Sequence, residues 1–351
     1  MMQGMTQTDE REVVRRQHLA EKIVFVDGLF GCGKTMLSPI VGALDRVELP
    51  SYAYELEYVC ALYGLGKMTR DAAETMVRMV TDLQLYNTMM SRETNFRPSD
   101  LSSVFRSATP WRYVRRLFQK GDEMIPERIR EERPILLLTT HNMLSVSEPI
   151  FAALRARAVL VEVVRHPLYM LKQQTLNMEG LHGDVRDFTI YFRHGDHDLP
   201  FFVHGWEEQF LTASLVERAI YYMHCMGGRT RAMKERMMNK YGAQILTIPF
   251  ERFVIDPNPY LQQITSAVGT TVTRTTKRMM RKQRVPRQRY AEGLKLGIYE
   301  RCGWEPPEKN ATEKEELRKR RHYAVENSAS DEALYLLDEL SATYEATVLG
   351  E

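Results

Sequence analysis

The stretch VFVDGLFGCGKT, residues 24–35, decides the fold of this chain. It matches the pattern G-x-x-x-x-G-K-[ST] without a mismatch. Its apolar start predicts a buried strand, and residues 36–44 predict a helix. The turn between them therefore lies at a helix N-terminus, where free N–H groups favour the binding of a phosphate. We therefore expect a phosphate-binding loop formed by Gly28, Gly31, Cys32, Gly33, Lys34 and Thr35.

Two side chains of this loop are suited to contact a bound phosphate. Lys34 adds a positive charge and Thr35 adds a hydroxyl group. The alternative is a turn that binds nothing, and the strand and helix expected on either side of the motif disfavour it.

The composition is that of an ordinary globular protein. The chain has 351 residues, of which 44% are hydrophobic and 27% charged, and a net charge of +2. This charge gives no general attraction to nucleic acid or to a membrane surface. The four cysteines form no C-x-x-C pair, which is typical of a reducing compartment, so we expect a cytoplasmic protein.

The chain is expected to form one large α/β domain. Residues 1–20 are a charged leader, helical in part, without an apolar run that would indicate a signal peptide or membrane anchor. Residues 21–351 form the domain, with a helical insertion at about 51–132 and a second insertion at about 180–212. Within the second, residues 180–204 are rich in Gly, Asp, His and aromatic residues and predict a long loop.

Apolar segments that alternate with helices, without polar alternation, predict a parallel sheet of about five strands flanked by helices. Because the carboxyl ends of such strands line the ligand crevice, the phosphate loop, His141 and Arg165 are expected on one rim. The expected strands are residues 22–27, 46–49, 135–139, 158–164 and 244–249. The expected helices are residues 36–44, 53–65, 71–90, 147–155, 168–179, 215–241, 259–268, 271–282 and 331–349.

His141 and Arg165 each follow an apolar strand directly. Histidine titrates near neutral pH and can act as a general base on a substrate hydroxyl, or it can simply bond to a neighbouring backbone group. The guanidinium of Arg165 can bind a phosphate through two hydrogen bonds, or it can form an ion pair on the rim. Position alone leaves both pairs of alternatives open.

Two polar groupings are better explained by solvent exposure. The histidines of residues 194–204 and their neighbouring aspartates lack the spacing of a zinc site, which favours a solvated loop. The basic run consists of Arg274, Lys277, Arg278, Arg281, Lys282, Arg284, Arg287 and Arg289. No aromatic residue that could stack on bases is interleaved with this run, which disfavours nucleic-acid binding. The remaining explanations of the run are a solvated helix face or a clamp on a nucleotide.

The order and spacing of these blocks resemble the sulfotransferases that use 3′-phosphoadenosine 5′-phosphosulfate (PAPS). Cytosolic members of that family have a phosphate loop after the first strand, then a strand ending in Lys-Thr-His and a strand ending in Arg-x-Pro. A Tyr-Glu-Asp-Leu…Asp-Pro segment later leads into a helix. The matching blocks here are residues 28–35, 138–141, 163–167 and 248–257, while the long insertions match nothing in that family.

The resemblance implies a P-loop sulfotransferase fold and a role for several residues. His141 would take the proton of the acceptor, Arg165 would bind the 3′-phosphate, and the phosphate loop with Lys34 would hold the 5′-phosphosulfate. No metal is expected, and the product would be 3′-phosphoadenosine 5′-phosphate (PAP). Further contacts to the donor are expected from Gln173, Arg281, Lys282 and Arg284.

Four positions depart from the family pattern. Gly31 replaces a lysine of the loop, and Lys34 stands where the family has threonine or serine. Thr139 replaces the lysine before Thr-His, and Gln173 replaces a serine expected eight residues after the arginine. In other branches the base is a glutamate after the second strand, which makes Glu55 and Glu57 alternative candidates.

The rival interpretation is a P-loop kinase that uses ATP and magnesium to phosphorylate a small molecule. The Gly-Lys-Thr ending favours it, but no expected strand after the first ends in an aspartate to hold the metal. For a sulfotransferase, the acceptor is expected to be a carbohydrate or a small metabolite that offers a hydroxyl or an amine group. Aromatic residues expected to flank the cleft are Tyr52, Tyr54, Tyr58, Phe201, Phe202 and Trp206.

Overall fold

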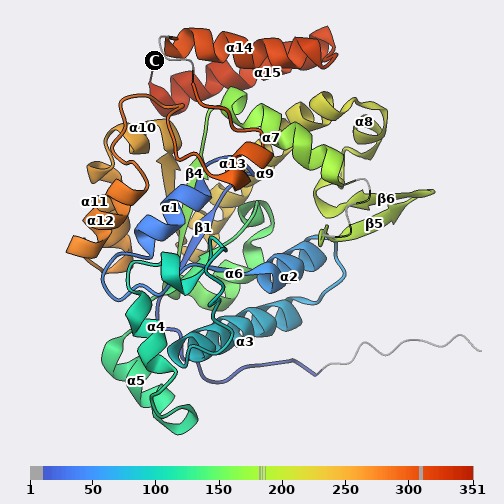
Figure 1. Cartoon of the computed structure of the whole chain (residues 1–351). Coiled ribbons are helices and arrows are strands. Elements are labelled where there is room, and N and C mark those ends of the chain that lie inside the picture. Colours follow the sequence, from blue (N-terminus) through green and yellow to red (C-terminus); the bar gives the residue numbers. More distant parts are fainter. Residues whose placement is uncertain (1–10, 182, 184, 186, 308–310, 351) are drawn as a thin grey trace, which may run out of the picture.

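Strand β1 (Ile23–Asp27) lies at the centre of a five-stranded parallel sheet in the computed structural model, which describes residues 11–181, 183, 185, 187–307 and 311–350. The sheet has the order β2-β3-β1-β4-β7. Its other strands are β2 (Ser51–Tyr52), β3 (Leu136–Thr139), β4 (Ala158–Val164) and β7 (Gln244–Pro249). All four pairings are parallel, and helices cover the sheet, as Figure 1 shows, so the α/β fold class expected from the sequence is confirmed.

Successive residues of the central strands point into two separate hydrophobic cores. Val24 and Val26 of β1 pack with helices α1 (Lys34–Val41), α7 (Pro167–Gly180) and the first half of α9 (Leu215–Tyr241). Ile23 and Phe25 pack instead with α2 (Tyr54–Gly64), α3 (Arg70–Met89) and α6 (Glu148–Leu154). Because both faces are buried, the strands read as continuous apolar runs.

The remaining helices surround this framework (Figure 1). Those before β3 are α4 (Pro110–Arg116) and α5 (Ile125–Glu132), and α8 (Glu207–Thr212) precedes α9. After β7 come α10 (Phe250–Ile255), α11 (Asn258–Val268), α12 (Arg274–Lys282), α13 (Gly297–Arg301), α14 (Glu313–Glu326) and α15 (Asp331–Tyr344). In the described part of the chain, no helix combines the length and apolarity needed to cross a membrane.

The strand expected at residues 46–49 is wrong, because β2 comes after Pro50. Arg46 has a φ of 59°, which bends the chain, and Val47 makes only an isolated bridge to Ile135. Pro50 has no N–H group to donate to a ladder, so regular pairing starts only beyond it.

The long loop expected at residues 180–204 is also wrong in part. Strands β5 (Tyr191–His194) and β6 (His197–Pro200) form an antiparallel hairpin. Its two-residue turn is Gly195-Asp196, and Gly195 has a φ of 56°, a conformation that glycine adopts without strain. A glycine followed by aspartate between two short runs is the signal that identifies this hairpin.

The leader contains no helix over residues 11–20, contrary to the expectation, and residues 1–10 lie outside the described part. The buried carboxylate of Asp82 accepts hydrogen bonds from the backbone N–H groups of Leu19 and Ala20, at 2.9 and 3.0 Å, and from Arg15 at 2.6 Å. These bonds hold the segment against α3 in an extended form.

The C-terminal helix is attached to the sheet through one buried carboxylate. Glu251 at the start of α10 is 1% exposed, and its Oε2 accepts a hydrogen bond of 2.6 Å from the Tyr344 hydroxyl of α15. Its Oε1 accepts a bond of 3.2 Å from the backbone N–H of His166. Burial and the Glu251 carboxylate raise the pKa of Tyr344, so the hydroxyl keeps its proton and remains a donor.

We predict that Tyr344→Phe lowers the free energy of unfolding by about 1–3 kcal/mol, because it leaves a buried carboxylate with one donor fewer. Guanidinium unfolding curves measure the change. Tyr335→Phe is the matched control, because Tyr335 lies on the same helix and is 73% exposed. Equal stability of the two variants would contradict the attachment described above.

Candidate functional site

The phosphate loop has the backbone that its glycines permit. The φ angles of Gly28, Gly31 and Gly33 are 147°, 82° and 107°, a region that other residues rarely adopt. A Cβ atom on Gly33 would lie 2.3 Å from the ring of Phe250, and one on Gly28 would lie 2.4 Å from the carbonyl oxygen of Val163. Only glycine fits at either position, so the loop is packed tightly against the ends of β4 and β7.

Lys34 is folded back onto the loop that contains it. Its Nζ donates hydrogen bonds to the carbonyl oxygens of Gly28 at 2.6 Å and of Leu29 at 2.9 Å, and the residue is 6% exposed. The ammonium group also lies 5.7 Å from the centre of the Phe30 ring. To contact a phosphate, Lys34 has to exchange these two carbonyls for the ligand.

Asp27, the last residue of β1, positions the loop that carries His141. Its Oδ1 accepts hydrogen bonds from the Thr140 hydroxyl at 2.8 Å and from the backbone N–H of Met143 at 3.1 Å. Its Oδ2 accepts a bond of 2.8 Å from the backbone N–H of Leu144. This carboxylate is 1% exposed and is committed to the connection between β1 and the segment after β3.

His141 and Glu57 form a hydrogen-bonded pair at the rim of the sheet. Glu57 Oε1 accepts a bond of 2.9 Å from the His141 backbone N–H and lies 3.2 Å from Nδ1 of its ring. The ring is stacked with Phe30 and Tyr52, at centroid distances of 5.0 and 5.6 Å. Nε2 has no hydrogen-bond partner among the described residues, so with Nδ1 donating to Glu57 the Nε2 atom is available to accept a proton.

Two other candidates near His141 have different surroundings. Glu55 is exposed on α2 and is not among the residues that line the cavity around His141. Thr139 is buried, and its hydroxyl forms a hydrogen bond of 2.9 Å with the hydroxyl of Ser38 on α1. The two glutamates considered as alternative bases are thus distinguished, because only Glu57 reaches the histidine.

Arg165 lies against the phosphate loop with little compensation for its charge. Its NH1 donates a hydrogen bond of 2.9 Å to the carbonyl oxygen of Gly31, while its Nε is buried without a hydrogen-bond partner in the described part of the protein. The nearest carboxylate oxygen, of Glu251, is 3.9 Å away. Burial lowers the pKa of Arg165 in spite of Glu251, which indicates a site that favours a bound anion.

A second guanidinium, that of Arg287, shares the Phe250 ring with Arg165. The guanidinium carbons of Arg165 and Arg287 lie 4.2 and 5.5 Å from the ring centre. Arg287 donates only to carbonyl oxygens and forms no ion pair with the described residues. Burial, followed by the charge of Arg165, lowers the pKa of Arg287 to about 10.

These groups line one cavity of about 240 Å³, which we call the P-loop pocket. It brings together Gly31, Gly33, Lys34, Thr35, His141, Arg165, Gln173, Phe250 and Arg287, while Glu292, Leu294, Tyr299 and Trp304 cover it from the C-terminal part. Burial raises the pKa of Tyr299 to about 12, so this hydroxyl is a hydrogen-bond donor at neutral pH. The rim expected from the sequence thus forms a pocket with a base and two poorly compensated cations.

Gln173 and Gly31, two of the departures from the family pattern, lie in contact. A Cβ on Gly31 would be 2.9 Å from Oε1 of Gln173, closer than real contacts of this kind. The end of the glutamine side chain therefore occupies space that a side chain at position 31 would need. The two departures are thus in contact, and their effects on stability are expected to be coupled.

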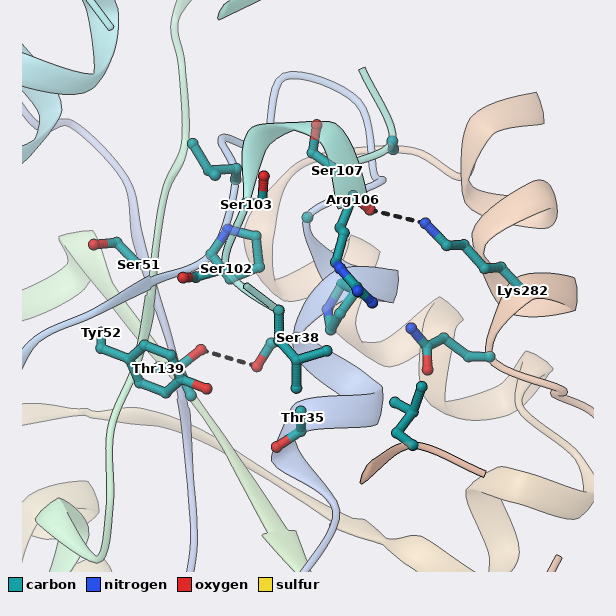
Figure 2. A pocket seen from close by; sticks show the side chains of 18 of the residues that line it. Thr35, Ser38, Ser51, Tyr52, Ser102, Ser103, Arg106, Ser107, Thr139 and Lys282 are labelled. Atoms are coloured by element: carbon teal, nitrogen blue, oxygen red, sulfur yellow. Dashed lines mark hydrogen bonds between the residues drawn. The ribbon is translucent and has the colours of Figure 1, made fainter. Parts of the chain in front are cut away.

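The basic residues expected at the donor are spread over different surroundings. Arg281 is exposed, and Arg284 donates a bond of 3.2 Å to the carbonyl oxygen of Gly293. Lys282 lines a neighbouring pocket beside α1, shown in Figure 2. Arg287 is the one member of the basic run that lines the P-loop pocket. It lies beyond the end of α12, and no pattern in the sequence distinguishes it from the other members of the run.

Cys32 and three of the aromatic residues expected at the cleft do not contribute side chains to the pocket. Cys32 is 1% exposed and points to the opposite side of the loop, and burial raises the pKa of its thiol. Phe202 and Trp206 belong to a hydrophobic core, and Phe201 packs against it, whereas Tyr52 and Tyr54 stack with His141. Among the described residues, no group of three or more His, Cys, Asp or Glu side chains is arranged to hold a metal ion.

Comparison with known proteins gives similarities at the level of structure alone. No family model and no curated protein matches this chain. The sulfotransferase domain of the Synechococcus PCC 7002 olefin synthase is similar with a TM-score of 0.45 and 13% identity, over 95% of this chain and 98% of that one. For the sulfotransferase domain of the curacin biosynthetic pathway the TM-score is 0.41 at 11% identity, over 87% and 97%. For sulfotransferase STF1 of Mycobacterium tuberculosis H37Rv it is 0.36 at 13% identity, over 86% and 76%.

We predict that Gly31→Ala destabilises the protein less when Gln173→Ala is also present. The φ of 82° costs about 1–3 kcal/mol whether residue 173 is glutamine or alanine. The contact with Oε1 exists only when residue 173 is glutamine, so we expect a coupling free energy of at least about 0.5 kcal/mol between the two substitutions. Chemical unfolding of the two single variants and the double variant measures it. Gly66→Ala is the control, because Gly66 has a φ of 67° and nothing within 4 Å of its Cβ position. Strict additivity at position 31 would show that the contact is absent.

Proposed function

We propose that this chain is a sulfotransferase that transfers the sulfuryl group from PAPS to a hydroxyl group of a small-molecule or carbohydrate acceptor. The observation that carries the proposal is the P-loop pocket, in which a phosphate loop, a histidine oriented by a carboxylate and two poorly compensated guanidiniums meet. A hydroxyl acceptor needs a base, and a donor with phosphates at two positions needs cations at both.

His141 is the proposed base. Its Nε2 takes the proton of the acceptor hydroxyl as the acceptor oxygen forms a bond to sulfur and the bond from sulfur to the 5′-phosphate oxygen breaks. Glu57 holds the ring through Nδ1 and stabilises the imidazolium that forms. Lys34 and the N–H groups at the start of α1 neutralise the charge that develops on the leaving phosphate.

Arg165 and Arg287 are the proposed partners of the 3′-phosphate. Both line the pocket, both lie against Phe250, and burial depresses the pKa of each. A phosphate placed between them would relieve their mutual repulsion and give Arg165 Nε the acceptor it lacks. Lys34 and Thr35 line the same pocket at the start of α1, where the 5′ end of the donor would lie, so the residues present fit PAPS.

The Gly-Lys-Thr ending favours ATP and magnesium as the second candidate, a small-molecule kinase. Such an enzyme needs a carboxylate near Thr35 to hold the metal. Asp27 is the nearest along the sequence, and it already accepts three hydrogen bonds from the segment after β3. The two guanidiniums lie together against Phe250, where they suit a 3′-phosphate, which ATP lacks, and we therefore prefer the sulfotransferase.

The cysteines bear on the compartment in which this reaction would run. All four are free, Cys32 and Cys60 being buried. Free thiols persist in a reducing environment, so we propose the cytoplasm.

PAP is predicted to raise the melting temperature of the full chain more than ATP with magnesium does. The two guanidiniums recognise a 3′-phosphate, which ATP lacks, and a ligand that binds only the folded state stabilises it. Differential scanning fluorimetry with both ligands, and with adenosine 5′-phosphosulfate as the analogue without a 3′-phosphate, measures the difference. Arg287→Gln should remove most of the preference for PAP, and Arg281→Gln, at an exposed position, should not. Stabilisation by ATP with magnesium alone would contradict the proposal.

His141→Ala is predicted to lower kcat at least about a thousandfold while changing the affinity for PAP less than about threefold, because the base acts on the acceptor and not on the nucleotide. Glu57→Gln should lower kcat less, because it removes only the group that orients the ring. Turnover is followed by release of PAP, and calorimetry measures its binding. Glu55→Gln is the matched control on the same helix. Full activity of His141→Ala together with loss of activity in Glu57→Gln would assign the base to Glu57.

A further inference from the structure

A second pocket of about 270 Å³ opens directly beside the P-loop pocket. The two share Thr35, Tyr52, Leu101, Gln283, Leu294 and Tyr299 in their walls. Tyr52 stacks on His141 at a centroid distance of 5.6 Å, so the shared wall lies next to the proposed base. A ligand whose reacting group is at His141 can therefore extend past Tyr52 into the second pocket.

The walls of this second pocket combine apolar and hydroxyl groups. Leu49, Pro50 and Leu101 contribute apolar surface, and Figure 2 shows the hydroxyl-bearing residues Ser38, Ser51 and Thr139 around the cavity. Thr139 and Ser38 are already bonded to each other at 2.9 Å. No Asp or Glu is among the described residues that line the pocket.

Two cations, Arg106 and Lys282, line the end of the pocket opposite Tyr52 and Thr139 in Figure 2. Lys282 donates a hydrogen bond of 3.2 Å to the backbone carbonyl oxygen of Arg106, and Arg106 NH2 lies 3.5 Å from the carbonyl oxygen of Ser99. Neither side chain forms an ion pair within the described part of the chain. Partial burial, and then the charge of Arg106, lowers the pKa of Lys282, which indicates that the two positive charges lie near each other.

We propose that this pocket selects the acceptor, and that the acceptor is an elongated, largely apolar molecule with an anionic group at the end remote from its reacting hydroxyl. The anionic group binds between Arg106 and Lys282, and the apolar part lies along the wall formed by Leu49, Pro50 and Leu101. This inference rests on the proposed sulfotransferase function, because it uses His141 as the point from which the acceptor extends.

The same cations could in principle bind the 3′-phosphate of the donor. The distribution of charge favours the acceptor, because the donor already has Lys34 and α1 for its 5′ end, and Arg165 and Arg287 for its 3′-phosphate. Those two guanidiniums share the Phe250 ring, whereas Arg106 and Lys282 lie in the wall of the other cavity. An acceptor carboxylate, phosphate or sulfate is the one anion that remains to be matched.

The test uses ω-hydroxyalkanoates, from hydroxyhexanoate to hydroxydodecanoate, and their uncharged methyl esters as probes. Isothermal titration calorimetry measures their binding to the full chain, alone and saturated with PAP. At least one acid should bind at least about tenfold more tightly than its ester, and Arg106→Gln and Lys282→Gln should each remove most of that preference. Lys277→Gln is the matched control, because Lys277 is exposed on the same helix and lines neither pocket. PAP affinity should be the same in all variants.

Two outcomes would overturn the inference. The first is a loss of PAP affinity in Arg106→Gln and Lys282→Gln, which would assign these cations to the donor. The second is equal binding of every acid and its ester by the unmodified chain. Failure of the proposed function has a different signature. A chain that does not bind PAP, but keeps a preference for acids that depends on Arg106 and Lys282, would contradict the donor and support the anion subsite.

Discussion

The carboxylate of Asp27 determines the geometry of the candidate site. It ends the central strand, immediately before the phosphate loop, and accepts hydrogen bonds from Thr140, Met143 and Leu144 on the segment that carries His141. Bonds of this kind to a buried charge contribute about 1.5–3 kcal/mol each, so the distance between the loop and the histidine cannot change without a large cost. A backbone bond of 3.1 Å from Asn142 to the Gly28 carbonyl oxygen closes the same connection. The segment that carries the proposed base is thus fixed to the phosphate loop by Asp27 and by this backbone bond.

The candidate site is marked by weakly compensated cations as well as by its loop motif. Glu48 and Arg116 show the ordinary arrangement, a buried bidentate pair with bonds of 2.7 and 3.0 Å, in which each charge is compensated. Arg165 has only a long ion pair of 3.9 Å with Glu251, and Arg287 donates its hydrogen bonds to carbonyl oxygens. The anion that we propose between them would supply the missing compensation.

Long, periodic elements of this fold can be predicted from the sequence, and short or irregular ones cannot. The strand expected over 158–164 and the helix expected over 215–241 are confirmed at both ends, because each repeats a single period over many residues. The two residues of β2 are too few to show a hydrophobic pattern. Helix α13 lies in a segment whose position depends on tertiary packing over the pocket, so local sequence does not predict it. His141 and Arg165 could be selected because each follows a buried strand, a position that the sheet defines. Arg287 could not, since no local pattern places a residue of a C-terminal loop against Phe250.

The departures from the family pattern become intelligible when their positions are considered together. A lysine cannot stand at position 31, because the φ of Gly31 is 82° and Gln173 fills the adjoining space. The positive charge that the family places there is present instead on Lys34, which starts α1 and reaches back to the carbonyls of Gly28 and Leu29. The loop thus has one positive charge, and Lys34 brings it from the start of α1 rather than from position 31. The Gly-Lys-Thr ending is that of an ATP-binding loop, whereas the PAPS donor that we propose depends on Arg165 and Arg287 beside it.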